Sequence, residues 1–368
     1  MKRISLILPC ILIALCMDVA AFDGGRLVDR TLRLDYIFSG TDKTCDIALA
    51  HLKSLDGWAG RRVNLDTLPL RGNGQLTMTD KATGDTLYCT SFSTLFQEWQ
   101  TTVEATRVRR SFENVFLVPM PAAPAEICVR LFDFHDNTLA SMTHPVDPSD
   151  ILIKPAGGWK SGEGAAAGVD GQFWRVLHHG GSPEEKIDVV ILAEGYTAPE
   201  METFYSDARA AVESLFAHEP FGTMRDCFNI VAYGVPSEDS GVSVPREGVW
   251  KETAVGSHFD TFYSDRYLTT PELFRMHNAL SDIPYEHIIV LANTDTYGGG
   301  GIYNSYTLTT AHHKAFAPVV VHEFGHSFAG LADEYAYDDQ YVEYYYPDTE
   351  PWEQNITTRA DFASKWED

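Results

Sequence analysis

The chain has 368 residues and a formal net charge of −24, because 52 Asp and Glu outnumber 28 Lys and Arg. Such an excess of negative charge repels nucleic acid and anionic membrane surfaces, which argues against partners of either kind. The length exceeds that of one ordinary compact core, so two domains are expected. Beyond the first 21 residues the cysteines show no CxxC spacing, which predicts neither a disulfide scaffold nor a cysteine-zinc ribbon: Cys45, Cys89, Cys128 and Cys227.

Residues 1–21 have the pattern of a secretory signal peptide. Lys2 and Arg3 precede an apolar run over residues 4–17, and small residues then precede the expected cleavage point. No later stretch holds the ~18 consecutive apolar residues of a membrane span, so no transmembrane segment is predicted in the mature chain. We therefore expect a secreted, periplasmic or cell-surface protein. Lipid attachment at Cys16 is the less favoured route, since Leu15 is a poor fit to the small residue it requires.

Residues 22–155 are predicted to form an all-β sandwich. Short runs rich in β-branched and aromatic residues are broken by turn signals throughout this region. The clearest of these runs cover residues 32–38, 75–78, 115–118 and 127–132. A stretch rich in glycine and alanine follows, and residues 156–180 are interpreted as a linker or exposed loop.

From residue 181 onward the pattern changes to strands alternating with helices, which indicates an α/β domain over residues 181–368. Four glycines at 298–301 are interpreted as a loop that leads into a strand at 302–309. That strand is a candidate sheet edge for pairing with an extended peptide substrate. The other expected elements are strands at 187–192, 228–235 and 288–292 and a helix at 200–217.

The sequence HEFGH at residues 322–326 is predicted to lie on a helix over residues 318–329. Pro318 is favourable in a first helical turn, and Gly330 suits the left-handed position just past a helix end. Val320, Val321, Phe324 and Phe328 form one apolar stripe, and the two histidines project from roughly the opposite side.

His322 and His326 lie one helical turn apart on the same face, so both imidazoles can reach one metal ion with Glu323 beside them. Two imidazoles and one carboxylate leave a fourth zinc position open for water. We therefore expect one catalytic Zn²⁺, with Glu323 as the general base in peptide-bond hydrolysis. The domain is accordingly predicted to be a zincin-like metallopeptidase.

The third metal ligand has several candidates. In the metzincin pattern a glycine follows the second histidine, and the next ligand lies three residues beyond that glycine. Gly330 then leads to Asp333, although this glycine stands one position late and Ala332 occupies the strict ligand position. Glu334 is the alternative, and a thermolysin-like peptidase would use Glu343 from a second helix.

Two further interpretations concern the residues around the motif. Tyr306 and Tyr335 are candidates for substrate binding and for stabilising the oxyanion. The acidic residues after the motif indicate a solvated surface or a structural Ca²⁺ site, although their spacing differs from an EF-hand loop: Asp333, Glu334, Asp338, Asp339 and Glu343.

Three segments together resemble the bacterial immunoglobulin A metallopeptidase family. They are KIDVVILAEGYT at 186–197, GGGGIYNSYTLTTAHH at 298–313 and VVVHEFGHSFAGLADEY at 319–335. The resemblance implies zinc, secretion and endopeptidase action on extracellular, host-associated protein, and it assigns His322, Glu323 and His326 to the motif. It places the third ligand within the DEY segment. Because family members continue beyond this point with more of the catalytic domain, a C-terminally truncated sequence is expected.

A competing interpretation treats the chain as a non-catalytic cell-surface protein. In that case the β-sandwich would be an adhesion or glycan-binding module and the second domain a scaffold. Zinc content separates the two interpretations, because a binding module has no reason to retain one zinc ion per chain.

Overall fold

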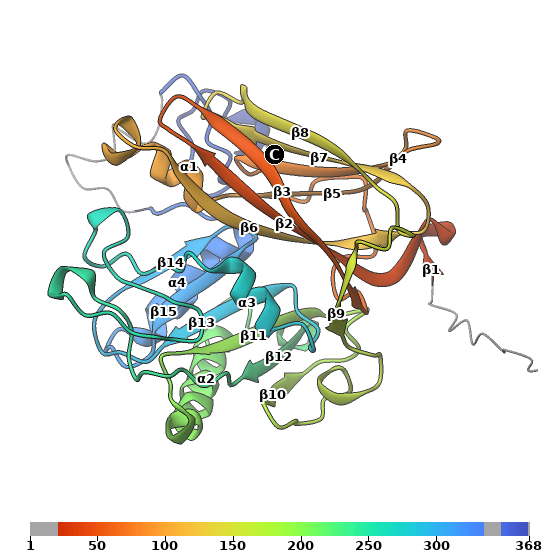
Figure 1. Ribbon diagram of the computed structural model, residues 1–368. Coiled ribbons are helices and arrows are strands. Elements are labelled where there is room, and N and C mark those ends of the chain that lie inside the picture. The colour runs from red at the N-terminus through yellow and green to blue at the C-terminus, as the bar shows by residue number, and fades with distance from the viewer. Residues whose placement is uncertain (1–20, 335–346, 367–368) are drawn as a thin grey trace, which may run out of the picture.

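The computed structural model describes residues 21–334 and 347–366, and it divides into a β-sandwich and a mixed sheet with helices (Figure 1). In Figure 1 the sandwich lies above the mixed sheet, and the C-terminal segment lies beside the sandwich. Within the described residues no helix is both long and apolar enough to cross a membrane.

Two sheets form the N-terminal sandwich. The larger has the order β1-β2-β3-β9, with β6 paired to β2, and the smaller has the order β5-β4-β7-β8. A short helix, α1 (Leu95–Gln100), follows β5. The strands are β1 (Ala21–Phe22), β2 (Leu27–Gly40), β3 (Cys45–Asp56), β4 (Gly74–Asp80), β5 (Thr86–Phe92), β6 (Arg110–Pro121), β7 (Ala125–Phe132), β8 (Thr138–Val146) and β9 (Lys154–Gly158).

The inner faces of these two sheets share one apolar core. In β7, buried and less buried residues alternate along the strand, as expected when one face of a sheet is covered. Phe38 and Phe116 from the larger sheet meet Phe92 from the smaller one, with the Phe92 and Phe116 ring centroids 4.3 Å apart. The four β-runs predicted in this region all lie within strands of this sandwich.

The second domain is built on one mixed sheet with the order β10-β12-β11-β13-β15-β14. The strands β12, β11, β13 and β15 are parallel, and the two edge strands run antiparallel to their neighbours. These strands are β10 (Trp174–His179), β11 (Ile187–Glu194), β12 (Phe228–Tyr233), β13 (His287–Ala292), β14 (Gly299–Ile302) and β15 (Tyr306–Thr310).

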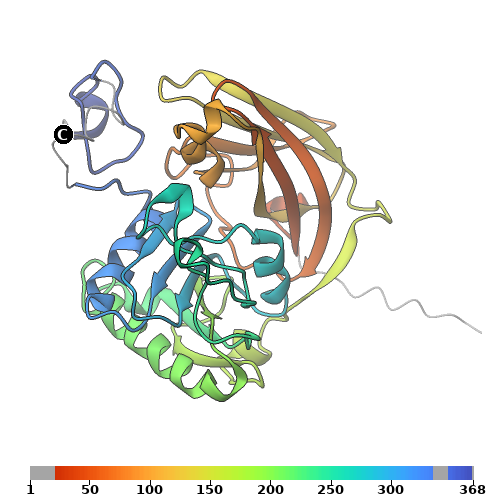
Figure 2. The ribbon, with the colours of Figure 1, turned by 60° about the vertical axis from the view of Figure 1, so that its left-hand side comes forward.

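Helices α2 (Met201–Phe216) and α4 (Phe316–Ala329) cover one face of this sheet (Figure 2). The other face packs against α3 (Leu273–Ala279) and the long segment before it. Strand β11 is therefore buried on both sides, which explains its unbroken apolar run. A last short helix, α6 (Ala363–Trp366), lies in the C-terminal segment.

Two sequence-based expectations need correction in this region. Residues 156–180 are not simply a linker, because they contain the end of β9, which pairs with β3, and all of β10, which pairs with β12. The glycine run is not a loop before one long strand either. Residues 299–302 form β14 and return through a tight turn into β15, because glycines allow a close strand where side chains would collide.

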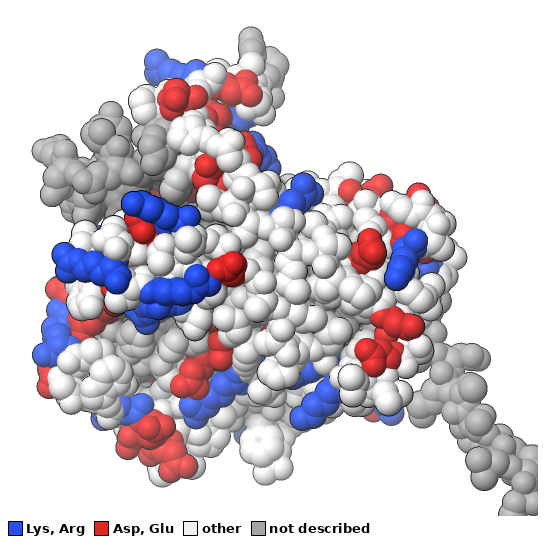
Figure 3. All heavy atoms as spheres, turned by 45° about the horizontal axis from the view of Figure 1, so that its top comes forward, with Lys and Arg blue, Asp and Glu red and all other residues white. Residues whose placement is uncertain are grey.

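On the face shown in Figure 3, acidic and basic side chains are interspersed among uncharged ones. No large basic patch gathers on that face. The domain interface, in contrast, contains buried charge: Arg33 and Asp35 have no solvent exposure, and Arg33 Nε lies 2.6 Å from Asp35 Oδ1.

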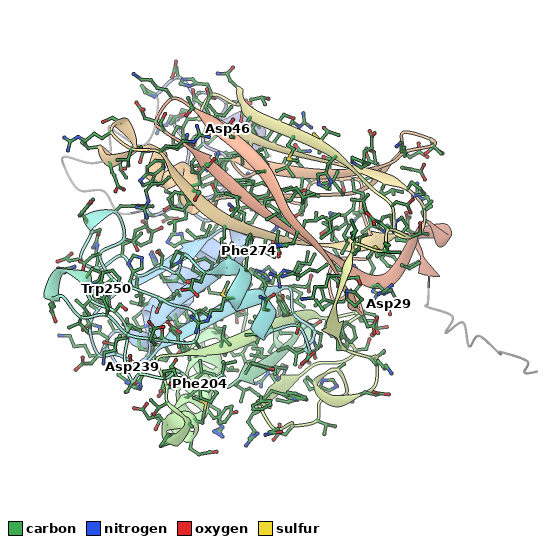
Figure 4. All side chains as sticks on the ribbon, viewed as in Figure 1. Asp29, Asp46, Phe204, Asp239, Trp250 and Phe274 are labelled. Carbon is green, nitrogen blue, oxygen red and sulfur yellow. The ribbon has the colours of Figure 1, made fainter. Side chains whose placement is uncertain are left out.

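This buried pair joins the two domains. Arg33 also donates to Asn278 Oδ1 at 3.0 Å and to the Phe274 carbonyl at 3.1 Å, and both acceptors lie on α3. Phe274 occupies the boundary between the sandwich and the second domain (Figure 4). Lys53 Nζ lies 3.0 Å from Asp35, so the carboxylate has two cations around it.

We predict that Arg33→Met lowers the free energy of unfolding by roughly 3–5 kcal/mol, because it leaves Asp35 buried with one partner removed. Arg30→Met is the matched control in the same strand, since Arg30 pairs with the exposed Asp56 and should cost less than about 1 kcal/mol. Urea denaturation of both variants measures the difference. Equal losses of unfolding free energy in the two variants would contradict the view that the buried Arg33–Asp35 pair stabilises the domain interface.

Candidate metal centre

Helix α4 carries the HEFGH sequence and begins two residues earlier than predicted, at Phe316. Pro318 lies in its first turn, where its missing N–H has no helical acceptor to lose. The helix ends at Ala329, and Gly330 adopts the expected left-handed conformation with φ of 60°. Its N–H donates to the His326 carbonyl at 2.9 Å, which closes the last turn.

The apolar side of α4 packs on the sheet and directs the histidines away from it. Val320 and Phe324 are buried against β11 and β13, and Phe328 stacks on Phe324 with ring centroids 5.0 Å apart. The His322 side chain is 41% exposed and that of His326 is 18% exposed. The helix thus presents both imidazoles at the molecular surface, as the spacing predicts.

The Asp333 carboxylate lies close to both histidine rings. Its Oδ1 lies 3.1 Å from His322 Nε2 and 3.2 Å from His326 Nε2, and the two Nε2 atoms are 3.1 Å apart. In a tetrahedral zinc site, bonds of ~2.0–2.1 Å place neighbouring ligand atoms about 3.3 Å apart. The spacing of the three atoms therefore fits one zinc ion, which these side chains could hold. Among the described residues they form the one cluster of this kind.

Hydrogen bonds orient the His326 ring and set the pKa values of His326 and Asp333. His326 Nδ1 lies 2.5 Å from the Leu331 carbonyl, which can only accept, so Nδ1 carries the proton and Nε2 faces the site. Burial opposes the charged form of His326, but its bonds to Asp333 and Leu331 raise its pKa to about 9. Burial also acts against ionised Asp333, yet the hydrogen bonds from both histidines hold its pKa well below the usual value.

Glu323 lies between the two histidines in sequence and is partly buried. Burial raises the pKa of its carboxyl above the usual value, and the nearby imidazoles of His326 and His322 oppose that rise. A carboxylate with a raised pKa beside paired imidazoles is a candidate for proton transfer.

The glycines of β14 lie directly under this part of the helix. A Cβ built on Gly299 would come within 2.7 Å of Glu323 Oε1, and one on Gly301 within 2.3 Å of the Glu323 carbonyl oxygen. A Cβ on Gly300 would meet the Tyr267 ring at 2.7 Å. The glycine run therefore permits the edge strand, the helix and Tyr267 to approach closely.

The N-terminal domain contributes a carboxylate to the surroundings of the site. Tyr267 donates to Glu98 Oε2 on α1 at 2.5 Å, and Glu98 interacts electrostatically with His326 and Glu323. Burial raises the Glu98 pKa to about 7, against the effects of the Tyr267 hydrogen bond and His326. Nothing in the sequence pointed to Glu98, because it lies in the other domain, far from the motif along the chain.

Other candidate residues lie in different settings. Tyr306 is 2% exposed and its hydroxyl contacts the Thr270 backbone, so its side chain lies in the core of the second domain. The Glu334 carboxylate accepts a hydrogen bond from Asn355 Nδ2 at 3.0 Å. It does not belong to the cluster that His322, His326 and Asp333 form. Tyr335, Glu343 and most of the candidate calcium cluster lie outside the described residues.

The helix, its paired histidines and the returning carboxylate together are the features of a metallopeptidase site. Comparison with known families agrees: the model of IgA Peptidase M64 matches residues 176–368, and that of the Peptidase M64 N-terminus matches residues 24–143. The first match alone spans more than half of the chain, so the protein belongs to the IgA peptidase M64 family. No curated protein matches the chain.

We predict that Gly301→Ala destabilises the fold by about 1–3 kcal/mol and weakens metal binding, because the added methyl meets helix backbone that cannot move aside. Gly325→Ala is the matched control, because Gly325 lies within HEFGH but has room for a methyl group. Its Cβ would meet Leu331 at 3.5 Å, an ordinary contact, and the helix gains up to about 1 kcal/mol. Thermal denaturation and metal titration measure both. Greater damage from Gly325→Ala would refute this account of the glycines.

Proposed function

We propose that this protein is an exported zinc endopeptidase that hydrolyses peptide bonds of extracellular proteins. The observation that carries the proposal is the convergence of His322 Nε2, His326 Nε2 and Asp333 Oδ1 within 3.2 Å of one another beside Glu323. Family membership supports the metallopeptidase class. The N-terminal segment with secretory signal pattern, residues 1–21, supports export.

The three converging side chains would hold the metal, with the fourth position left for water or substrate. When bound, zinc supplies Lewis acidity, which lowers the pKa of a water molecule toward neutrality and polarises a carbonyl group. The Leu331 carbonyl assists by accepting from His326 Nδ1, which orients the Nε2 side of the ring toward the position the metal would take.

Glu323 is proposed to hold the proton that moves during the reaction. It would accept a proton from the attacking water and then deliver it to the nitrogen of the departing amine. Burial makes its charged form less stable, which raises its affinity for the proton it would accept.

Strand β14 is the proposed docking edge for the substrate backbone, in place of the strand expected at 302–309. On the edge of β14 that faces away from β15, the Gly299 N–H donates to the Arg266 carbonyl and the Gly299 carbonyl accepts from the Leu268 N–H. In an antiparallel ladder alternate residues face the same edge, so the N–H and C=O of Gly301 also point outward. An extended peptide could pair there, beside Glu323 and His326, by main-chain hydrogen bonds.

Glu323→Gln should retain one zinc per chain while turnover of a fluorogenic peptide library falls by about 10²–10⁴-fold, because the amide cannot accept the water proton. A strong zinc chelator should abolish wild-type cleavage, and added zinc should restore it. Full activity in the presence of chelator would reject the metal mechanism. Absence of both zinc and cleavage would favour the non-catalytic binding protein.

Asp333→Ala should reduce zinc below one ion per chain, because it removes the carboxylate that faces both histidines. Glu334→Ala is the adjacent control and should retain full zinc, since its carboxylate bonds with Asn355. Elemental analysis of the purified variants gives the stoichiometry. Loss of zinc from Glu334→Ala alone would reassign the third ligand.

A further inference from the structure

We propose that Asn355 is a positioning residue that holds the metal-ligand loop in place, and that residues 347–366 thereby form part of the metal centre. The inference rests on the proposed zinc function and extends it to a segment without a metal-binding motif. Asn355 lies 22 positions beyond Asp333 in the sequence, and residues 335–346 between them lie outside the described range.

The Asn355 side-chain amide forms hydrogen bonds with the residues on either side of Asp333 in the sequence. Its Oδ1 accepts from the Ala332 N–H at 2.9 Å, and its Nδ2 donates to the Ala332 carbonyl at 2.8 Å. Nδ2 also donates to Glu334 Oε1 at 3.0 Å. One side chain therefore satisfies both backbone groups of the residue before Asp333 and the side chain of the residue after it.

The loop needs such support because residues 330–334 belong to neither a helix nor a strand. A loop without regular backbone pairing has many accessible conformations, and ordering it costs conformational entropy. With the backbone of Ala332 engaged by Asn355, the next side chain is directed toward His322 and His326. The hydrogen bond between Leu331 and His326 fixes the other end of the same loop.

Asn355 is itself presented by a folded segment. Trp352 packs on Tyr303 with ring centroids 5.4 Å apart, and its ring lies close enough to Gly330 that a Cβ there would come within 2.6 Å. Lys365 donates to the carbonyl groups of Glu353 and Ile356, at 2.8 and 2.9 Å, on either side of Asn355. These contacts fix the segment that carries Asn355, so its side-chain amide is held in position to bond with Ala332.

Together these contacts favour a role for Asn355 in metal affinity. Partners that orient metal ligands from outside the coordination shell typically change metal affinity or activity by ~10–100-fold when removed. Asn355 would act through Asp333 and needs no contact with substrate or metal.

The test compares Asn355→Ala and Asn355→Asp with wild type and with Gln354→Ala. Gln354 is the matched control because it is adjacent and exposed, and its side chain bonds only to the Trp352 carbonyl among the described groups. Asn355→Asp keeps the shape and one acceptor but loses the donor to Ala332 and Glu334. Zinc dissociation constants come from chelator competition, and the absorption spectrum of the cobalt-substituted protein reports ligand geometry.

We expect both Asn355 variants to bind zinc about 10–100-fold more weakly and to show an altered cobalt spectrum, with Gln354→Ala unchanged. Saturating zinc should restore kcat to near the wild-type value, which a general loss of folding would not permit. Zinc affinity within twofold of wild type in both variants would overturn the inference while leaving the peptidase proposal intact. A wild-type protein that binds no zinc would overturn both.

Discussion

The metal centre depends on the reversal of the chain at Gly330, because this turn returns the following residues to the helix that carries the histidines. Its φ of 60° disfavours any side chain, and a Cβ would also meet the Trp352 ring. Beyond the turn, the Leu331 carbonyl reaches His326 Nδ1 and the Asp333 carboxylate reaches His326 Nε2. The same reversal therefore sets both the orientation of His326 and the position of Asp333, two of the candidate ligands.

The reversal is held from three parts of the chain. Helix α4 supplies the histidines, the C-terminal segment supplies Asn355 and Trp352, and the N-terminal domain supplies Leu70, which a Cβ on Gly330 would also approach. The turn between β14 and β15 is tied to the N-terminal domain as well, through paired hydrogen bonds between Ser93 and Tyr303. The sandwich is therefore in direct contact with the elements around the site, and Glu98 extends that contact to the neighbourhood of Glu323.

Much of the local structure could be predicted because short-range physics dictates it. The apolar run at 187–192 indicated a strand, which the structure buries on both faces, and the spacing of His322 and His326 placed them on one side of a helix. The glycines at 298–301 were misinterpreted because a glycine run has the same composition in a flexible loop and in a strand under close packing. Tyr306 was ambiguous for a similar reason, since an aromatic residue in a strand can face a cleft or the core.

The sequence by itself determined the motif, the helix that carries it, its termination at Gly330 and the broad division into a β-rich and an α/β region. Each depends on contacts between residues a few positions apart, which composition and periodicity record. Only the tertiary structure decided that Asp333 rather than Glu334 faces the histidines, that β14 lies against Glu323, and that Asn355 and Glu98 adjoin the site. These arrangements depend on how distant segments pack: the spacing after Gly330 offered Asp333 as one candidate among several, and nothing in the local sequence pointed to β14, Asn355 or Glu98 as neighbours of the site.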